Sequence, residues 1–483
     1  MSPDDGNVLL DIAPNAVKRV HLVGVGGTGM GAFAGMLKAA GYDVTGSDEN
    51  VYPPMSDMLR DWGIEVFTPY APGNLDRAQP DLVIIGNVIR RVNPEATAVR
   101  ARGLPQMSFP AAFGSLVLAD KHSVVIVGTH GKTTTAALMA HVLVEAGQDP
   151  SFLIGGVTLN HGGNFRLGGG AHVVVEGDEY DTAYFDKGPK FLHYRARTAL
   201  LTSIEFDHAD IYADMAHYES AFVKFCETLP PDGFLGVSAS YPDAVDLARS
   251  SSKAPVITYA VNGKADYRAD GETFSAEGAR FYIHTPRDKK RDLHLPMSGY
   301  HNIENAAGVY AAARALGLSH EQIANGFATF KGVKRRQEIR ADLAGVTVMD
   351  DFAHHPTAVR ETIEAVRQRY PERRLWAVFE PRSNTSRRNI HQADYVTALL
   401  GADLATIREP EPHDQVPEQQ RLDVPAIVRE LETQGVIANS APDVESLVAH
   451  VGAETRPNDL VLVMSNGSFG GFLPSLISVL ERR

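Results

Sequence analysis

The amino-acid sequence predicts an α/β protein built mainly on parallel sheets. Short and almost wholly apolar runs recur along the chain, and stretches with the apolar spacing of helices separate them. Strands that are buried on both faces have this continuous apolar character, which is typical of parallel sheets. Glycine-rich loops follow two of the runs, as expected where a strand turns sharply into a helix. The runs are HLVGV, DLVIIG, SVVIVG, HVVVEG, TALLTS, VTVMDD, LWAVFE and LVLVMS.

Size and charge limit the functional classes. With 483 residues, the chain has room for about three domains of roughly 150 residues each. Its net charge of −13 gives no indication of binding to nucleic acid or to an anionic membrane. Cys226 is the only cysteine, which excludes an internal disulfide framework. Since the sequence also shows neither a secretory signal nor the ~18 apolar residues of a membrane helix, we expect a cytoplasmic protein with no nucleic-acid partner, no membrane insertion and no evident obligate protein partner.

The unit of strand, glycine loop and helix appears more than once and divides the chain into three expected domains. The first covers 15–118, and the second covers 119–331 and opens with SVVIVGTHGKTTT. The third covers 332–483 and begins after the KGVKRR segment, where VTVMDD starts a new series of strands and helices. The first and third are expected to be Rossmann-like. A polar stretch from Arg249 to Asp292 is expected to form surface sheet and loop within the second.

The first glycine loop, in HLVGVGGTGMGAFAGMLKAAG, has the spacing GxGGxG between a strand and a helix. Gly24, Gly26, Gly27 and Gly29 let the backbone turn tightly and approach a pyrophosphate, whose charge then lies against helix N–H groups. Asp48 follows the next strand, where a carboxylate can accept a hydrogen bond from a ribose hydroxyl. The loop therefore predicts a nucleotide site. A nicotinamide-dependent dehydrogenase begins in the same way, and a plain strand-to-helix turn is the structural alternative.

The second glycine loop, GTHGKTTT, lies between the apolar strand SVVIV and the helical pattern TAALMAHVLVEAG. Its backbone amides can hold phosphates, Lys132 can pair with the β and γ phosphates, and the Thr133 hydroxyl can bind Mg²⁺. The full Walker spacing places another glycine where this chain has Ile126, so the loop is a shortened one. It predicts a central ATPase domain that binds ATP with Mg²⁺. The expected ATP-binding residues here are Gly128, Thr129, His130, Gly131, Lys132, Thr133 and Thr134.

Seven motifs follow one another in an order that identifies a family. They are GVGGTGM, GTHGKTTT, EGDEYD, EFDHADIY, GYHNIENAAG, KRR at 334–336 and DDFAHHP. In these motifs the chain resembles the Mur ligases, ATP-dependent enzymes that build the peptide of the bacterial cell wall on a UDP-muramyl carrier. The resemblance covers nearly the whole chain after the first fifteen residues. It implies that the first domain holds the UDP sugar nucleotide, the second ATP, and the third the amine substrate.

The resemblance also assigns site residues. It places the first glycine loop on the UDP pyrophosphate, with Asp48 and Asn87 lining the same cleft. Glu176 and His208 join Thr133 around magnesium, although histidine is the less usual ligand for Mg²⁺. A strand-end carboxylate and a helix-capping histidine are the structural alternatives for these two. Lys224 lies where some members carry a carbamylated lysine, but its spacing from His208 does not match, and it is left out.

Further ATP contacts are implied beyond the phosphate loop. His301, Asn302 and Asn305 crowd the start of the helix in GYHNIENAAGVYAAARALG, where amide groups suit an adenine edge. A capping role for Asn302 is the alternative. Arg336 resembles an arginine that reaches the ATP phosphates, and Asp351 and His354 resemble groups that contact the ATP ribose or phosphates. The adjacent pair His354 and His355 could instead indicate a transition-metal site. The expected catalytic residues are Lys132, Glu176, His208 and Arg336.

Two reactions remain open within the family. One member adds free L-alanine to UDP-N-acetylmuramate, and a recycling member adds the tripeptide L-alanyl-γ-D-glutamyl-meso-diaminopimelate. The insertion carrying FDKGPKFLHYR and the segment FEPRSNTSR resemble the recycling member. Arg382, Ser383 and Asn384 follow the strand LWAVFE and are expected to meet the carboxylates of the tripeptide. A solvated loop arginine is the structural alternative. We expect the tripeptide reaction, through an acyl phosphate, with the alanine reaction as the alternative.

Overall fold

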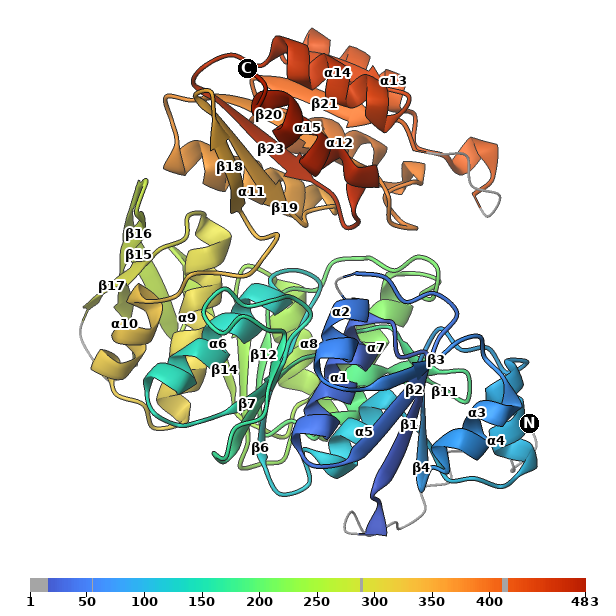
Figure 1. Cartoon of the computed structure of the whole chain (residues 1–483). Helices are drawn as coiled ribbons and strands as arrows, with labels where there is room; N and C mark the ends of the chain where they lie inside the picture. Colours follow the sequence, from blue (N-terminus) through green and yellow to red (C-terminus); the bar gives the residue numbers. More distant parts are fainter. Residues whose placement is uncertain (1–15, 54, 287–289, 411–415) are drawn as a thin grey trace. The chain divides into compact units, whose positions relative to one another are not determined.

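The computed structural model describes residues 16–53, 55–286, 290–410 and 416–483. The chain divides into two compact units, which Figure 1 shows with all labelled elements. Unit 1 comprises the residues up to Ile204, Ala216–Tyr259 and Gly308–Gly326. Unit 2 comprises Glu205–Met215, Ala260–Ala307 and Phe327–Arg483.

All eight apolar runs form strands, so the predicted α/β class is confirmed. These strands are β1 (Arg19–Val23), β4 (Leu82–Ile85), β6 (His122–Val127), β9 (His172–Glu176), β12 (Thr198–Leu201), β19 (Val346–Asp351), β20 (Arg374–Phe379) and β23 (Asp459–Met464). One run is shorter than its sequence indicates. TALLTSIEFDH suggests a strand that continues to His208, but β12 ends at Leu201. The chain leaves the sheet there because Thr202 and Ser203 bond to the phosphate loop instead.

The first sheet of unit 1 is fully parallel, in the order β3-β2-β1-β4-β5. Helices α1 and α5 lie on one face and α3 and α4 on the other (Figure 1). This is the order of a Rossmann-like half, and the strand order reverses between β1 and β4, where such sheets bind ligands. The remaining elements are β2 (Asp43–Ser47), β3 (Glu65–Phe67), β5 (Gln106–Ser108), α1 (Thr28–Ala39), α2 (Met55–Asp61), α3 (Pro72–Ala78), α4 (Pro94–Ala101) and α5 (Phe109–Leu116).

The second sheet of unit 1 carries the phosphate loop. Seven of the ten strands of this sheet run in the order β14-β13-β12-β6-β9-β7-β8, all parallel pairs except the last. Strand β6 is at its centre, and Val124–Val127 are fully buried. A short hairpin and a 3₁₀ turn follow β9. The remaining elements are β7 (Ser151–Leu153), β8 (Phe165–Arg166), β10 (Asp181–Ala183), β11 (Asp186–Pro189), η3 (Lys190–His193), β13 (Phe234–Ser238), β14 (Val256–Val261), α6 (Lys132–Glu145), α7 (Met215–Thr228), α8 (Pro242–Ser251) and α10 (His320–Ala328).

An antiparallel meander in unit 2 comes largely from the polar stretch 249–292. Strand β15 (Tyr267–Ser275) pairs with β16 (Gly278–His284), which pairs with β17 (Arg291–Leu295). The alternation of polar and apolar residues in β16 places one face inward and the other in solvent, as expected for antiparallel strands. Helix α9 (Tyr300–Ala315) follows, and the division between the units falls within it, after Ala307.

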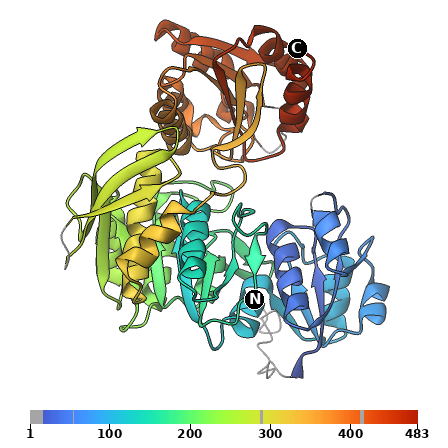
Figure 2. The same ribbon diagram turned by 60° about the vertical axis from the view of Figure 1, so that its left-hand side comes forward.

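The second sheet of unit 2 has the order β18-β19-β23-β20-β21-β22 and is parallel except for β18. Side chains alternate across it: Ala377 and Phe379 pack with α11–α13, while Trp376 and Val378 pack with α14 and α15. Figure 2 shows helices on both sides of this sheet, in the part of the chain coloured orange to red. Both faces are thus covered by helices, which explains the continuous apolar runs. The elements are β18 (Glu338–Leu343), β21 (Leu404–Arg408), β22 (Ile437–Ala441), α11 (Pro356–Arg369), α12 (Gln392–Leu399), α13 (Val424–Thr433), α14 (Val444–Glu454), α15 (Phe472–Leu480), η4 (Asn389–His391), η5 (Glu418–Gln420) and η6 (Phe469–Gly471).

Among the residues that the structure describes, no helix combines the length and the apolar character required to cross a bilayer.

Candidate active site

The phosphate loop joins the end of β6 to the start of α6. Gly128 has φ +127°, and a Cβ at this position would lie 2.8 Å from the Ser203 amide nitrogen, so glycine is required by both conformation and space. The Ser203 carbonyl accepts the Thr129 N–H at 3.0 Å, and the Ser203 hydroxyl accepts the His130 N–H at 2.8 Å. The loop is therefore fixed against the segment that follows β12.

Lys132 is folded back onto its own loop. Its ammonium donates to Glu179 Oε1 at 2.8 Å and to the carbonyls of Gly128 and Thr129 at 2.5 and 3.1 Å. Burial lowers the pKa of Lys132, but the nearby carboxylates, Glu179 first, raise it more, and the net shift is upward. The lysine is therefore charged at neutral pH. Because all three of its donors are in use, a phosphate that bound at Lys132 would have to replace one of these protein acceptors.

Thr133 and Glu176 converge at the first turn of α6. The Thr133 hydroxyl donates to Glu176 Oε1 at 2.8 Å, and the Gly155 N–H donates to Glu176 Oε2 at 2.7 Å. A Cβ on Gly155 would lie 2.8 Å from the same Oε2, so the carboxylate rests directly against the backbone. Two oxygen donors held side by side suit Mg²⁺, which prefers hard oxygen ligands. The residues present thus fit the predicted magnesium site, while its assignment stays a prediction.

Two acidic residues close to Lys132, Asp178 and Glu179, were not among the expected site residues. Glu179 is almost fully buried and also accepts a hydrogen bond from the Tyr218 hydroxyl at 3.3 Å. Asp178 pairs with Lys190. Burial raises the pKa of Asp178, but the Lys190 ammonium outweighs this and lowers the pKa to about 2. The motif EGDEYD contained this signal, because buried acids beside a phosphate-loop lysine need cationic partners.

The first glycine loop is held by the end of β2. Gly24 has φ +89°, and its N–H donates to the Ser47 carbonyl at 2.8 Å. Gly26 donates its N–H to Asp48 Oδ2 at 2.8 Å, and a Cβ on Gly26 would lie 2.9 Å from that oxygen. Gly27 precedes α1 and Gly29 lies in its first turn. Asn87 is exposed beyond β4, so the structure brings the predicted UDP-sugar residues to one edge of the sheet.

A buried carboxylate that the sequence did not reveal supports this loop. Glu95 is fully buried and accepts the Ser47 hydroxyl at 2.5 Å, a side-chain amide of Asn74, and the Ala71 N–H at 3.1 Å. Its Oε2 also lies 3.4 Å from His21 Nε2. Burial raises the pKa of Glu95, but these hydrogen bonds lower it more, and the net shift is downward. No sequence motif marks Glu95, because its partners come from three different segments.

The start of α9 holds the three residues expected to meet adenine. Asn302 and Asn305 are buried, and His301 is half-buried. The Asn302 side-chain amide donates to the Ser298 carbonyl at 2.8 Å, which ties the helix start to the preceding turn. This bond is not an N-cap, in which a side-chain oxygen accepts a helix N–H, so the capping role and the adenine contact of Asn302 both stay predictions.

Arg336 and Asp351 belong to one tightly bonded region of unit 2. The Arg336 guanidinium lies 4.5 Å from the centre of the Phe352 ring. Asp351 is buried and accepts the Gln337 N–H and the Ala353 N–H, both at 2.8 Å. Burial raises the pKa of Asp351, and Arg336 opposes this. The structure therefore places the two predicted ATP residues together.

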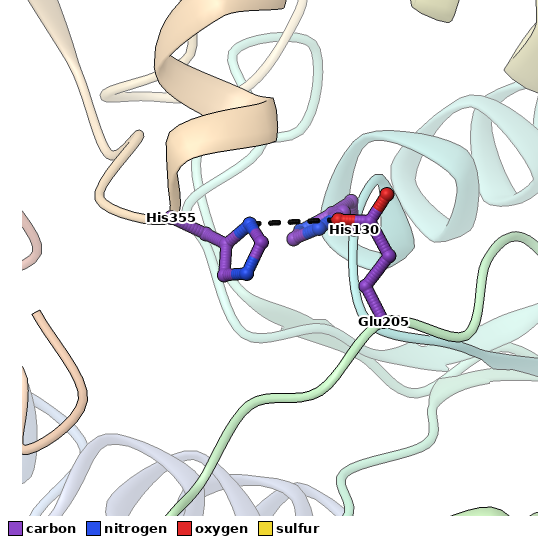
Figure 3. Close-up of side chains that lie close together, drawn as sticks. All are labelled: His130, Glu205 and His355. Atoms are coloured by element: carbon purple, nitrogen blue, oxygen red, sulfur yellow. Dashed lines mark ion pairs between the residues drawn. The ribbon is translucent and has the colours of Figure 1, made fainter. Parts of the chain in front are cut away.

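His208 and His354 both act on Asp207. His354 Nε2 lies 3.9 Å from Asp207 Oδ2, and Asp207 Oδ1 accepts the His208 N–H at 2.7 Å. Burial raises the pKa of Asp207, but its neighbours, His208 first, lower it far below the ordinary range. His355 instead faces Glu205, with Nδ1 3.6 Å from Oε2 (Figure 3). The two adjacent histidines thus lie against different carboxylates.

The carboxyl edge of the last sheet carries the predicted substrate loop. Arg382 and Asn384 are exposed there, and the Ser383 hydroxyl bonds to Ser386 at 2.9 Å. The sequence did not reveal a buried pair at the same edge, in which Arg408 donates to Glu380 at 3.3 Å. The Ser465 hydroxyl also donates to Glu380, so residues from three strand ends meet.

Comparison with known proteins identifies the family. Three family models match the chain: Mur ligase family, catalytic domain, at 19–121; Mur ligase middle domain at 126–313; and Mur ligase, glutamate ligase domain, at 335–467. The chain belongs to the Mur ligase family. It is therefore an ATP-dependent ligase that forms an amide bond in the building of bacterial peptidoglycan, and it has the three-domain α/β fold of that family. The domain limits at 118 and 331 stay predictions.

Two kinds of Mur ligase are similar to this one. The UDP-N-acetylmuramate–L-alanyl-γ-D-glutamyl-meso-2,6-diaminoheptandioate ligase of Haemophilus influenzae is 36% identical over 470 residues, which cover 96% of this chain and 100% of the relative. The UDP-N-acetylmuramate–L-alanine ligase of Phenylobacterium zucineum is 32% identical over 476 residues, covering 97% and 96%.

Solved structures of both kinds also match. A murein peptide ligase from Psychrobacter arcticus has a TM-score of 0.71 and 32% identity, covering 96% of this chain and 99% of that one. A UDP-N-acetylmuramate–alanine ligase from Thermotoga maritima has a TM-score of 0.77 and 25% identity with the same coverage. The comparisons thus show the family, and relatives with either amine substrate match this chain.

Proposed function

We propose that this Mur ligase joins the carboxylate of UDP-N-acetylmuramate to the amine of L-alanyl-γ-D-glutamyl-meso-diaminopimelate, in peptidoglycan recycling. The observation that carries the proposal is the 36% identity, over nearly the whole chain, to a relative named for that reaction. The alanine ligases, at 32%, support the second candidate, which is addition of free L-alanine. Because either reaction uses ATP, we place the protein in the cytoplasm.

The chemistry explains the residues around the phosphate loop. A carboxylate does not acylate an amine directly, so transfer of a phosphoryl group to it first creates an acyl phosphate, from which the amine expels phosphate. Two anions meet in this step, and Lys132 and Arg336 are the cationic side chains that neutralise them. Magnesium bound by Thr133 and Glu176, with His208 in the proposed set, would supply further neutralising charge at the phosphates.

The third domain offers groups for a substrate with several carboxylates. Arg382 and Asn384 are exposed at the carboxyl edge of the last sheet, where ligands bind in such folds. An arginine and an amide suit carboxylate recognition because both donate hydrogen bonds in fixed geometry. Free alanine carries one carboxylate, whereas the tripeptide carries more, so this edge favours the larger amine.

The test is ADP release with UDP-N-acetylmuramate and one of two amines. We expect the tripeptide to support ADP release and L-alanine to give no more than the rate without amine. The product mass should equal the sum of the sugar nucleotide and the tripeptide less one water. Activity with alanine alone would replace the proposed reaction by the second candidate.

A further inference from the structure

A surplus of negative charge surrounds the phosphate-loop lysine. Glu176 ends β9, and Asp178 and Glu179 lie just beyond it. Glu179 pairs with the Lys132 ammonium at 2.8 Å, and the negative charges of Glu179, Glu176 and Asp178 raise the pKa of Lys132. An ATP molecule brings further negative charge to this place. Since Lys132 must exchange Glu179 for a phosphate oxygen, any other free carboxylate nearby would compete for the ammonium and repel the nucleotide. The site therefore needs a cationic side chain that neutralises one of these carboxylates.

Lys190 is placed to do this. Its Nζ lies 2.5 Å from Asp178 Oδ2, and its side chain is only 14% exposed. The other oxygen of Asp178 accepts the Tyr180 N–H at 3.0 Å. The carboxylate of Asp178 is thus held on both oxygens, with a full positive charge on the side of Lys190. The pair is only partly buried, because the Asp178 side chain keeps 38% of its surface exposed while Lys190 is largely covered.

The chain around Lys190 is anchored, so the pair is not a chance surface contact. Lys190 opens η3, directly after the hairpin β10–β11. Asp186 of this hairpin accepts the Ser108 hydroxyl at 3.1 Å and lies 2.8 Å from His193 Nε2. Arg100 donates to the Tyr184 hydroxyl at 2.6 Å. Because Ser108 and Arg100 belong to the first sheet and α4, the insertion is fastened to the domain that carries the first glycine loop.

We propose that Lys190 is a positioning residue that engages the Asp178 carboxylate and so keeps Lys132 available for the phosphates of the nucleotide. The role acts through Lys132 and requires no contact between Lys190 and any substrate. It gives a purpose to the FDKGPKFLHYR insertion, which supplies the lysine. The inference rests on the proposed ATP site, but not on the identity of the amine, so the two proposals can fail separately.

The first test replaces the lysine and measures nucleotide affinity directly. Lys190→Met should weaken the binding of Mg²⁺ with β,γ-methylene-ATP by about 10-fold to 100-fold, the range found when a supporting partner of a site residue is removed. Isothermal titration of the full-length protein measures this without turnover. In assays, KM for ATP should rise while KM for UDP-N-acetylmuramate stays unchanged. Unaltered nucleotide affinity would overturn the proposal.

Lys187→Met is the matched control. Lys187 lies on the same hairpin and pairs with Asp181 at 2.9 Å, but its side chain is 66% exposed. An exposed ion pair contributes little to the free energy of folding, so its loss should leave the site intact. Nucleotide affinity should stay within about twofold of the native value. An equal loss in both variants would overturn the proposal, because it would show that any charge change in the hairpin weakens the site.

A second variant separates charge from structure. The double variant Lys190→Met/Asp178→Asn has an uncharged side chain at both positions. No carboxylate at position 178 then competes with the nucleotide for Lys132. Nucleotide affinity should return to within about threefold of native, which is strong coupling in a double-mutant cycle. If the single variant does not fold, the double variant alone tests the idea. Affinity of the double variant as low as that of Lys190→Met, or clearly below native, would show that Lys190 acts in another way.

Discussion

The two glycine loops of unit 1 have the same backbone design and different charge. Each follows a buried parallel strand, begins with a glycine at positive φ and leads into a helix. The first loop, 24–29, contains no ionisable side chain and is gripped from outside by Asp48. The second loop ends in Lys132, whose raised pKa reflects the acids around it. Backbone geometry therefore makes both loops suitable for binding phosphate. Only the second loop also has a positive side chain, which could neutralise a phosphoryl group during its transfer.

The carboxylates that support the two loops also differ, in whether their hydrogen-bond partners stay fixed. Behind the first loop, Glu95 is fully buried and bonded to neutral or weakly basic groups, so it holds the loop in place. Behind the second, Glu176 bonds to Thr133 and Glu179 bonds to Lys132. In the proposed function, Thr133 and Lys132 exchange these partners when a nucleotide binds. A loop that binds a pyrophosphate without changing it needs a rigid support. A loop that takes part in phosphoryl transfer needs partners that can be exchanged.

Removing the charge of the second loop should have the largest effect. Lys132→Ala should lower the rate of ADP release by about 10²–10³-fold, because the transferred phosphoryl group loses a cation that stabilises it. The binding of UDP-N-acetylmuramate, measured by calorimetry, should change by no more than about twofold, because the first glycine loop and not Lys132 is proposed to hold the UDP pyrophosphate.

Lys132→Arg is the comparison variant for this prediction. It keeps the positive charge but cannot occupy the same position between Glu179 and the loop carbonyls. It should recover only part of the lost rate. Near-normal ADP release by Lys132→Ala would contradict the proposal that the second loop takes part in phosphoryl transfer and the first loop only binds.

The fold could be predicted from the sequence because local pattern determined it. Buried strands such as residues 124–127 are continuous apolar runs in the sequence. Both glycine loops can be recognised from the spacing of glycines within a few consecutive residues. The pairing of Thr133 with Glu176 was also accessible, since Glu176 ends a strand beside the loop. In a parallel sheet, neighbouring strands bring their carboxyl ends to one edge.

The supporting residues could not be predicted, because their roles depend on partners far away in the sequence. Glu95 meets Ser47 and Asn74, and Arg408 meets Glu380, with no motif that joins them. The strand expected to reach His208 ended at Leu201, because the bonds of Ser203 to the phosphate loop outweighed the apolar pattern. Tertiary hydrogen bonds of this kind leave no periodic trace in a single sequence.

Weakening the grip on the first loop should have a smaller effect than removing Lys132. Asp48→Asn removes the charge that holds the Gly26 N–H, so KM for UDP-N-acetylmuramate should rise about tenfold, the value of one charge-assisted hydrogen bond. KM for ATP should stay within about twofold. Asp43→Asn, at the exposed opposite end of β2, is the control and should leave both KM values unchanged. A rise in KM for ATP alone would mean that the loops had been assigned to the wrong ligands.

Changing the support beneath the first loop should have the smallest effect on turnover and a clear effect on stability. Glu95→Gln should lower the free energy of unfolding at pH 7 by about 1.5–3 kcal/mol, because hydrogen bonds to a buried charge are lost. The folded-state pKa of Glu95 lies below its ordinary value of 4.5. The stability from its ionised form is therefore present above pH 4.5 and is lost as the pH falls through the folded-state pKa. The native protein should lose this contribution on acidification, and the variant has none to lose.

Hydrogen exchange of the β1 and β4 amides, measured at pH 7 and below pH 4.5, checks this prediction within the first sheet. The difference between the native protein and Glu95→Gln should shrink at the lower pH. Glu65→Gln removes an exposed carboxylate, 63% accessible and paired with Arg77, and should change local stability by no more than about 0.5 kcal/mol at either pH. A difference that stays constant with pH would show that Glu95 supports the loop by shape alone. The contrast between a fixed buried charge behind one loop and exchangeable charges behind the other would then not hold.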